Sequence, residues 1–441
     1  MSVNEHSILL ISLGCDKNLV DSEKMLGALA RRGFRFTDDE DEADIVIVNT
    51  CCFIHDAKEE SILTMLELAK KKDSGQVRFL IVVGCLAQRY ESEIQKEIPQ
   101  VDAVLGTLSD ETILQVLDRL IETAPDEDDP AKPVKRHLST AGHFAYLKIA
   151  EGCDKYCTYC IIPSIRGSYK STPIEELVDE AKDLCAQGVQ ELILVAQETT
   201  RYGIDLYGRK RLPELLRALA EIESLRWIRL LYCYPEEITD ELIDLIAQEP
   251  KICRYLDIPI QHASDIVLKN MGRRTTKAQL RKRIKDMRRK LPGLCLRTTL
   301  ISGFPQETDD DHQELLDFVR EMHFERLGVF EYSKEEGTPA AKMHGQIPAR
   351  VKKKRRKELM KLQQELAFEK AGTMIGRTLL VLIEGKATEE EDVYVGRTYM
   401  DAPDVDGLFF LQSPEVYQTG QWVEAVVTGF HGYDLIGEVA R

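Results

Sequence analysis

At 441 residues the chain is too long for one ordinary hydrophobic core, so two or three domains are expected. With 43% hydrophobic and 30% charged residues it is a globular protein, which excludes a largely disordered chain. Its formal net charge of −16 excludes a protein that holds nucleic acid mainly through its overall charge. The longest apolar stretch, near residues 79–87, is far too short for a bilayer span, and the N-terminus has no signal pattern. We therefore expect a cytoplasmic protein without membrane contact.

The first segment, residues 1–122, alternates short apolar stretches with segments of helical periodicity. Strands are expected at Ser7–Leu13, Asp44–Asn49 and Arg78–Val83, and helices at Leu19–Arg31 and Ala57–Lys71. A strand–helix–strand rhythm joins parallel strands by right-handed crossovers. The segment is therefore predicted to form an open parallel α/β sheet.

Residues 123–141 contain Pro-Asp-Glu-Asp-Asp-Pro and no apolar periodicity, which predicts an exposed linker. Residues 142–372 then repeat a strand followed by a helix six times. The strands are expected to begin near Phe144, Glu191, Trp227, Tyr255, Leu294 and Arg326. Six such units predict an incomplete, TIM-like (βα)6 barrel, in which the chemistry belongs at the C-terminal ends of the strands. Its first helix is expected to have Thr172 as N-cap, Pro173 as first residue and Glu175 in a capping box.

The last segment, residues 373–441, is rich in strands, which are expected at Thr378–Ile383, Val393–Tyr399, Leu408–Gln412 and Gln421–Thr428. About 70 residues of this kind suit a small closed OB-like β-barrel. Residues 371–441 hold 12 acidic and 4 basic side chains, a net charge of −8. The whole chain is thus predicted to be a multidomain α/β protein with a small acidic barrel at its end.

The eleven cysteines do not suggest a disulfide framework, because the cytoplasm keeps thiols reduced. Cys153-x-x-x-Cys157-x-x-Cys160 directly follows the first strand of the central segment. Three thiolates on so short a segment can hold one iron–sulfur cluster and leave one iron without a protein ligand. Structural zinc, with Cys185 or His143 as a fourth ligand, is the alternative; the position at a barrel strand end favours the cluster.

A second set consists of Cys15, Cys51 and Cys85, each at the C-terminal end of an apolar strand of the first segment. These ends meet along one edge of a parallel sheet, and Gly14 and Gly84 allow close backbone approach. A single cysteine there would be an apolar filler, but three at equivalent positions indicate a second three-thiolate cluster. Cys52 is an alternative ligand to Cys51. Cys51 is preferred because it follows Asn-Thr. The other cysteines lie in apolar segments, where packing explains them: Cys185, Cys233, Cys253 and Cys295.

The C-x-x-x-C-x-x-C spacing on the first strand of a βα barrel resembles the radical S-adenosylmethionine (SAM) superfamily. Together with the other cysteine set and the terminal barrel, the layout resembles the radical methylthiotransferases over nearly the whole chain. The resemblance implies a methylthiotransferase domain with an Fe–S cluster in 1–122, a radical SAM domain in 142–372 and a TRAM domain in 373–441. It also implies two 4Fe–4S clusters, S-adenosylmethionine, and an electron donor such as flavodoxin or ferredoxin.

Several stretches resemble the branch of that family that modifies an aspartate of small-subunit ribosomal protein twelve. These are Ser12–Asn18, Cys160–Gly167, Gln261–Ser264, Glu336–Ala340 and Asp401–Gly407. The resemblance implies that a methylthio group replaces a hydrogen on the β-carbon of that aspartate. The acidic barrel favours such a basic protein, free or in the ribosome, over tRNA through complementary charge.

Two other functions remain open at this point. One is the same chemistry on a tRNA adenosine, and the other is an Fe–S binding or assembly protein without turnover, which three-ligand sets with an open iron disfavour. The sequence departs from the ribosomal branch at Asp16, where proline is usual, and at Cys52, where glycine is common; neither change removes a ligand. The basic stretch 269–290 allows an RNA contact, although such a run is more often the solvated face of a helix.

Further residues are expected to bind the cofactor. Tyr159, between two cluster ligands, can stack on adenine or pack at the strand end. The resemblance implies that Gln197 and Glu198 bond the methionine amino group and that other strand ends face the same site, at Gln261, His262 and Gly303. A histidine in such a place is more often a structural hydrogen-bonding group than a catalyst. Arg166 is expected to bind a carboxylate of cofactor or substrate, or to pair with a neighbouring helix.

Overall fold

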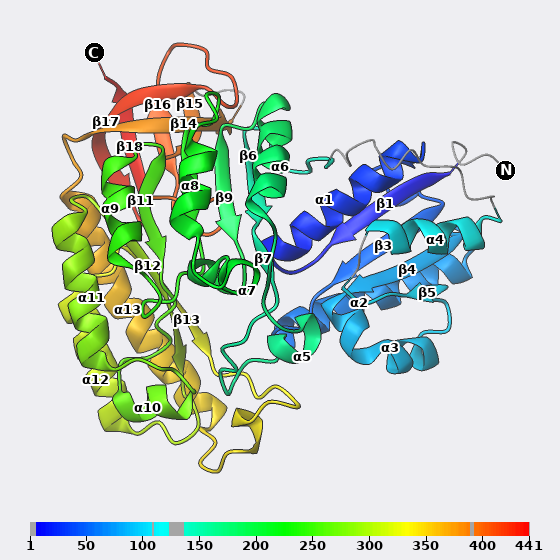
Figure 1. The fold of residues 1–441 in the computed structure, drawn as a ribbon, viewed down its shortest axis with the longest axis horizontal. Coiled ribbons are helices and arrows are strands. Elements are labelled where there is room, and N and C mark those ends of the chain that lie inside the picture. The colour runs from blue at the N-terminus through cyan, green and yellow to red at the C-terminus, as the bar shows by residue number, and fades with distance from the viewer. Residues whose placement is uncertain (1–5, 108–109, 123–135, 389–391, 441) are drawn as a thin grey trace. The chain divides into compact units, whose positions relative to one another are not determined.

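The computed structural model describes residues 6–107, 110–122, 136–388 and 392–440 (Figure 1). The described residues belong to two compact units. The first comprises the N-terminal part of the chain up to residue 139 with the short segments Glu151–Asp154 and Cys160–Tyr169, and the second comprises the rest. Most of the predicted linker, residues 123–135, lies outside the described residues.

The first unit contains a five-stranded sheet of parallel strands in the order β2-β1-β3-β4-β5. The strands are β1 (Ser7–Ser12), β2 (Arg35–Phe36), β3 (Ile45–Thr50), β4 (Phe79–Gly84) and β5 (Ala103–Val104). The helices are α1 (Asp16–Arg31), α2 (His55–Asp73), α3 (Cys85–Glu97), α4 (Asp110–Leu120) and α5 (Ile162–Arg166). The predicted open parallel sheet is confirmed, and the two-residue strands β2 and β5 are additions to it.

Two apolar clusters form the core of this unit. One joins α2 and α3 to the sheet through Met65, Leu68 and Leu86, and the other joins α1 and α4 through Leu29 and Leu117. Because both faces of the sheet are covered, the central strands are continuous apolar runs, which is why they stand out in the sequence.

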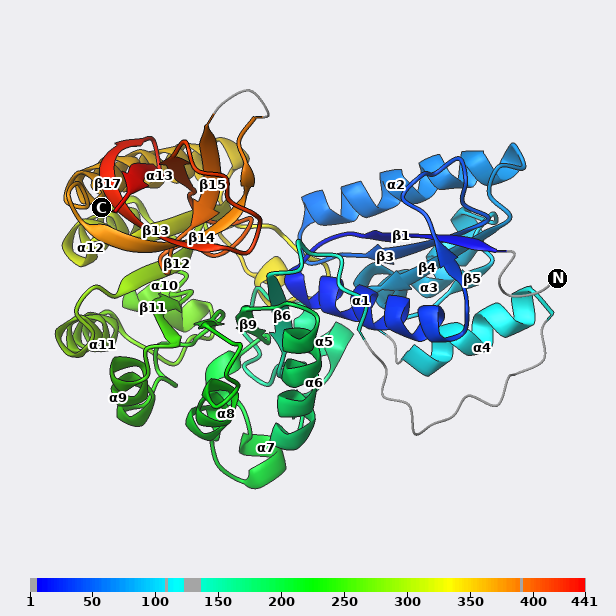
Figure 2. The same ribbon diagram turned by 90° about the horizontal axis from the view of Figure 1, so that it is seen from above.

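The second unit contains six parallel strands in the order β13-β12-β11-β10-β9-β6. They are β6 (Phe144–Lys148), β9 (Glu191–Val195), β10 (Trp227–Leu230), β11 (Ile252–Asp257), β12 (Cys295–Ser302) and β13 (Arg326–Glu331). The long helices are α6 (Ile174–Ala186), α8 (Leu212–Ala220), α9 (Asp240–Gln248), α11 (Lys277–Lys290), α12 (Asp309–Met322) and α13 (Ala349–Gly372). Figure 2 shows α6, α8, α9 and α11 in an arc around the strands. In the described residues β6 and β13 are the two edges of an open sheet, so the incomplete barrel is confirmed.

Short elements complete the second half of the chain. They are β7 (Ala150–Glu151), β8 (Lys170–Ser171), η2 (Thr199–Arg201), α7 (Ile204–Tyr207), α10 (Asp265–Asn270) and η3 (Ala340–Lys342). The predicted start of α6 is wrong by one residue: Pro173 is the N-cap, and no side chain caps the helix. Thr172 is not the cap because its N–H donates to the Ile149 carbonyl 3.0 Å away, which keeps it in the extended chain.

Five strands close into the predicted small barrel, in the order β14-β15-β16-β18-β17. They are β14 (Thr378–Lys386), β15 (Val393–Arg397), β16 (Phe409–Gln412), β17 (Trp422–His431) and β18 (Asp434–Val439). The fifth strand, β18, was not expected; it pairs with β16 and β17 and thereby closes the barrel.

Buried ion pairs attach this barrel to the six-stranded sheet within the second unit. Glu191 at the start of β9 accepts from Arg229 at 2.8 Å and lies 2.8 Å from Arg397 of the barrel. Arg229 also donates to the Tyr399 carbonyl at 2.6 Å. Since an unpaired buried charge is costly, these pairs require the barrel and the sheet to stay together.

Candidate iron–sulfur and cofactor sites

The structure brings Cys15, Cys51 and Cys85 together at the carboxyl edge of the first sheet. They directly follow β1, β3 and β4, which pair in parallel. Gly14 has a φ of +98°, and a Cβ there would lie 2.5 Å from the Cβ of Cys51. Charge on Cys15 or Cys85 raises the pKa of Cys51, so the three thiols are within electrostatic range of one another. Gly14 therefore provides the close backbone approach that the sequence suggested.

These thiols suit a positively charged cofactor. Burial raises the pKa of Cys51 to about 12 and also raises that of Cys85, so the folded chain alone keeps both thiols neutral. Cys15 is the N-cap of α1 and Cys85 is the first residue of α3, and helix N-termini favour negative charge. Binding iron would therefore release protons and leave thiolates at two positive helix ends.

The geometry does not suit a single ion. Among the described residues, no three Cys, His, Asp or Glu side chains surround one point closely enough to bind a metal ion. An iron–sulfur cluster has no such requirement, since each thiolate binds a different iron.

The two fourth ligands considered for zinc at Cys153, Cys157 and Cys160 have other contacts. His143 Nε2 lies 3.5 Å from Glu384 Oε1, and Cys185 is hydrogen-bonded to Ser224. Structural zinc, which needs four convergent ligands, is thus disfavoured.

Cys51 and Cys52 point to different surroundings. The Cys51 sulfur faces Gly14, whereas Cys52 is fully buried in the apolar core and its sulfur lies 3.3 Å from the Cys85 carbonyl oxygen. Cys51 thus lies against the turn that carries Cys15, whereas Cys52 packs in the core, and charge on Cys85 raises the pKa of both thiols.

Buried amides hold the carboxyl edge of the sheet together, and they were not identified as site residues from the sequence. Asn18 donates from Nδ2 to the carbonyls of Leu13 at 2.9 Å and Thr50 at 3.1 Å, which links the ends of β1 and β3. Asn49 in turn donates to the Asn18 carbonyl at 2.9 Å. The signal was present, since Asn18 follows Cys15 by three residues and Asn49 precedes Cys51 by two.

The other cysteine set lies on a single loop. Cys153 and Cys157 are buried and Cys160 is half-buried. Cys153 and Cys160 belong to the first unit, where the Cys153 N–H donates to the Gly167 carbonyl at 3.1 Å. Cys157 belongs to the second unit, where its sulfur lies 3.7 Å from the Tyr234 hydroxyl.

Arg166 ends α5 and belongs to the first unit. Its guanidinium forms ion pairs with Asp21 of α1 and with Glu151 at 3.2 and 2.9 Å, and its Nε lies 3.3 Å from the Cys85 sulfur. Of the two roles considered for Arg166, the structure contains the ion pair with a neighbouring helix.

Within the second unit, Gln197 and Glu198 directly follow β9. Glu198 is fully buried, and it accepts from the Thr200 N–H at 3.0 Å and from the Thr200 hydroxyl. Burial raises its pKa to about 7, although Lys155 lies 3.8 Å away. Tyr159 packs in part against an apolar cluster that includes Phe304.

Gln261, His262 and Gly303 lie near the carboxyl ends of β11 and β12. Gln261 bridges to β12, with its N–H on the Thr299 carbonyl at 2.9 Å. His262 is fully enclosed, its Nδ1 accepts from the Ser264 N–H at 3.0 Å, and burial lowers its pKa to about 3. The ring is therefore a neutral group that holds its own turn.

Gly303 is required by packing. Its φ is +72°, and a Cβ would lie 2.4 Å from Cγ of Lys352 on α13. Its N–H and that of Phe304 donate to the buried carboxylate of Glu307 at 2.6 and 2.9 Å, and Arg355 pairs with the same carboxylate. Glu307 was missed because its arginine partner lies 48 positions away, on α13.

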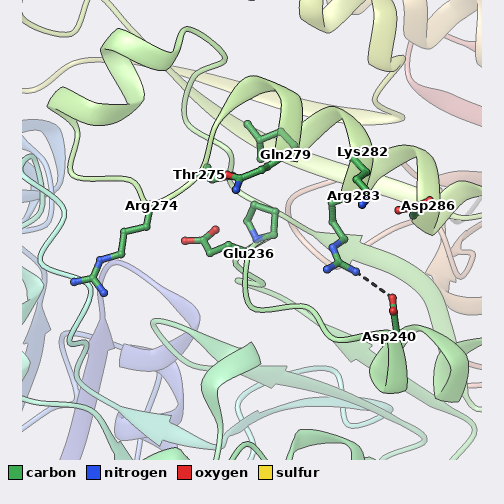
Figure 3. A pocket seen from close by; sticks show the side chains of 10 residues that line it. Glu236, Asp240, Arg274, Thr275, Gln279, Lys282, Arg283 and Asp286 are labelled. Atoms are coloured by element: carbon green, nitrogen blue, oxygen red, sulfur yellow. Dashed lines mark hydrogen bonds and ion pairs between the residues drawn. The ribbon is translucent and has the colours of Figure 1, made fainter.

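A polar cavity of about 350 Å³ lies between the loop after β10, the start of α9 and α11. Figure 3 shows Arg283 of α11 directed at Asp240 of α9, an ion pair of 3.2 Å. Other α11 cations pair with acidic residues of α12 and α9: Arg281 and Lys285 with Glu321, and Lys290 with Asp244. The basic stretch 269–290 is thus largely an ion-paired helix face.

Three family models match the chain in succession. Residues 7–106 match the Uncharacterized protein family UPF0004, residues 147–319 the Radical SAM superfamily, and residues 375–440 the TRAM domain. The first two imply S-adenosylmethionine and iron–sulfur clusters as cofactors. None of the helices in the described part of the chain is long and apolar enough to span a membrane.

The curated relatives match over almost their full length. The chain is 59% identical to the ribosomal protein uS12 methylthiotransferase RimO of Lachnoclostridium phytofermentans, over 98% of this chain and 99% of that protein. It is 49% identical to the protein of the same name from Pelotomaculum thermopropionicum, over 97% and 98%.

Solved structures share the fold at low identity. The radical S-adenosylmethionine methyltransferase TsrM of Kitasatospora setae has a TM-score of 0.54 at 16% identity, over 74% of this chain and 72% of that one. The cobalamin-dependent radical enzyme OxsB has a TM-score of 0.52 at 12% identity, over 81% and 56%. The near-complete match to the curated relatives shows that this chain belongs to the RimO family of ribosomal protein uS12 methylthiotransferases, which are radical SAM enzymes.

Proposed function

We propose that this chain transfers a methylthio group to the β-carbon of an aspartate in ribosomal protein uS12. Two 4Fe–4S clusters serve the reaction, the first held by Cys15, Cys51 and Cys85 and the second by Cys153, Cys157 and Cys160. The observation that carries the proposal is the meeting of the first three thiols at the carboxyl ends of β1, β3 and β4. Relatives that share 59% and 49% of the sequence bear the name of this activity.

Each donor set fits a cluster with one open iron, because each provides three thiolates where four would close it. The bound clusters and S-adenosylmethionine supply the electron transfer, the removal of the substrate hydrogen and the transferred sulfur. The chain's own part is to bind, orient and exclude water. We assign these tasks to the N-terminal methylthiotransferase segment 1–122, the radical SAM segment 142–372 and the TRAM segment 373–441, with 123–141 as the linker.

Residues at the carboxyl edge of the six-stranded sheet bind S-adenosylmethionine or support the residues that bind it. Gln197 and Glu198 receive its amino group, and Tyr159 covers its adenine from the apolar cluster. Gln261, His262 and Gly303 hold the turns that border this edge. The Gln261 N–H bond to β12, the His262 bond to Ser264 and the close approach of Lys352 to Gly303 support this.

Charge on the barrel supports a basic protein substrate over tRNA. Exposed acidic side chains of the described barrel include Asp392, Asp404, Glu415, Glu424 and Glu438. Of the four basic residues in 371–441, Arg397 is buried in its pairs with Glu191 and Glu384 and does not offset them. Complementary potential would attract a basic ribosomal protein, free or in the ribosome. Thiolate ligands also fit a cytoplasmic enzyme reduced by flavodoxin or ferredoxin.

The test offers both substrates to one enzyme preparation. Anaerobically reconstituted, reduced protein is incubated with S-adenosylmethionine and sulfide, and uS12 and tRNA are supplied in parallel. Mass spectrometry is expected to find one methylthio group on an aspartate of uS12 and unmodified tRNA. A modified adenosine would overturn the substrate, and deoxyadenosine without either product would overturn the transfer activity.

A further inference from the structure

Arg166 is a buried cation in direct contact with a thiol of the first cysteine set. It is 8% exposed, and its Nε lies 3.3 Å from the Cys85 sulfur. Arginine has five N–H donors in a rigid plane, and only one of them is on Nε. The single Nε–H of Arg166 therefore points at the Cys85 sulfur, which the proposed function assigns to the first cluster.

Three polar partners fix the plane of the guanidinium. Nη1 lies 2.9 Å from both carboxylate oxygens of Glu151 and 3.2 Å from the carboxylate of Asp21. Nη2 donates to Oδ1 of Asn18, the residue that also links the ends of β1 and β3. With Nη1 and Nη2 held in this way, rotation of the side chain is blocked and Nε–H stays aimed at the sulfur.

The backbone of Arg166 is fixed as well. Ile161, the N-cap of α5, and Ile165 within it pack into the apolar cluster that contains Cys85 and Leu86. Close packing of these side chains leaves little freedom to the short helix between them. The contact between Arg166 and Cys85 is thus set by packing as well as by hydrogen bonds.

We propose that Arg166 is a positioning residue of the first cluster, which donates Nε–H to the Cys85 thiolate and raises the reduction potential of that cluster. The inference rests on the proposed function, in that it needs a cluster on Cys15, Cys51 and Cys85. Hydrogen bonds to ligand sulfur and a nearby positive charge stabilise the reduced, more negative cluster, so the potential rises. They also keep the Cys85 thiolate in one orientation.

The experiment isolates the first cluster in the full chain. A parent carrying C153A, C157A and C160A is reconstituted with iron and sulfide, and its midpoint potential is measured by electron paramagnetic resonance (EPR). Arg166→Gln is expected to shift the potential to more negative values. Arg166→Lys, which keeps the charge and loses the planar fork, is expected to fall between the two. With all six cysteines present, Arg166→Gln is expected to lower methylthio product by about 10-fold or more.

Arg32→Gln is the matched control. Arg32 of the first unit also has a largely enclosed side chain, 5% exposed and paired with Asp118 at 2.8 Å. It follows the C-terminus of the 16-residue helix α1, about 24 Å from the Cys15 end at 1.5 Å per residue. Its loss removes a buried ion pair without touching sulfur, so the potential is expected to stay at the parent's value.

A second measurement needs no substitution at Arg166. In the parent labelled with ¹⁵N-arginine, pulsed EPR of the reduced cluster is expected to show ¹⁵N coupling and an exchangeable proton. An iron-loaded Arg166→Gln protein with the parent's potential, or a parent without ¹⁵N coupling, would overturn the role of Arg166 alone. A parent that binds no iron would overturn both this inference and the first cluster of the proposed function.

Discussion

At the carboxyl edge of the first sheet, Cys51 and Cys85 are buried thiols whose pKa values are raised by burial, and the contact with Arg166 does not cancel that rise at Cys85. At the carboxyl edge of the six-stranded sheet, two buried carboxylates accept hydrogen bonds from their own turns. Glu198 accepts from Thr200, and Glu307 accepts from two N–H groups and Arg355. The first edge thus has neutral thiols that a bound cation would ionise, whereas the second edge has carboxylates that support their own turns. Burial by itself does not distinguish a ligand from a supporting residue; the chemistry of the group and its contacts do.

The largest expected effect concerns the loop cysteines. Cys157→Ala removes one of three proposed ligands of the second cluster, to which we assign S-adenosylmethionine cleavage because its cysteine spacing resembles that of the radical SAM superfamily. We expect deoxyadenosine formation to fall below detection, since an open-iron cluster with two protein ligands is not retained. The measurement is chromatography of deoxyadenosine after reduction. Retained formation would show that Cys157 is not a ligand.

The first edge is tested by substitutions at Cys85 and at the neighbouring cysteines Cys51 and Cys52. Cys85→Ala is expected to abolish methylthio product while deoxyadenosine is still formed, because only the first cluster loses a ligand. Cys52→Ala is the matched control, since its sulfur lies in the apolar core and packs on the Cys85 carbonyl. It is expected to keep the product and to cost about 1 kcal/mol of stability through lost packing. If Cys52→Ala abolished the product and Cys51→Ala did not, the ligand assignment would pass to Cys52.

The ligand positions at the first edge were predictable from the sequence, because they depend only on which residues directly follow each strand. Cys15, Cys51 and Cys85 directly follow strands that are continuous apolar runs, so strand ends and ligand positions are read from the same pattern. Strand β18 was missed because its inward positions are Leu435 and Gly437, and glycine gives no apolar signal. Only in the folded barrel does Phe409 occupy the space above that glycine, with its Cζ 2.5 Å from where a Cβ would be.

Contacts between distant segments were not predictable. Arg166 meets Cys85 across 81 positions and Asn18 across 148, and no periodicity encodes either pair. The basic stretch on α11 likewise had the composition of an RNA contact, and its acidic partners lie on α9 and α12. Local patterns therefore give the elements and the ligand positions, while the surroundings that assign a role come from the tertiary fold.

The second edge is tested at His262. His262→Ala is expected to lower the free energy of unfolding by about 2–4 kcal/mol, because it leaves a cavity and an unpaired Ser264 N–H. The KM for S-adenosylmethionine is expected to stay within about 3-fold of the parent's, because the wholly buried ring supports a turn. His262→Asn, which can accept the same N–H, is expected to recover part of the stability. A large rise in KM with unchanged stability would make His262 a cofactor ligand instead.

The smallest effect is a pH dependence at Glu198. Burial raises its pKa to about 7 from an ordinary 4.5, so between these pH values the folded protein keeps a proton that the unfolded chain has lost. The free energy of unfolding of the cofactor-free protein therefore falls as pH rises through this window, by at most about 1.4 kcal/mol per pH unit from this group. Glu198→Gln stays uncharged and is expected to flatten the slope, whereas Glu176→Gln on the exposed face of α6 is expected to leave it unchanged.

The measurement is tryptophan fluorescence during denaturation at pH 5, 6 and 7. Both tryptophans, Trp227 and Trp422, lie in the second unit with ring centroids 4.5 Å apart, so their fluorescence reports on the unit that contains Glu198. Equal slopes in all three proteins would mean that Glu198 is already ionised at pH 5, and that the second edge, unlike the neutral thiols of the first, holds a buried charge balanced by Lys155 3.8 Å away.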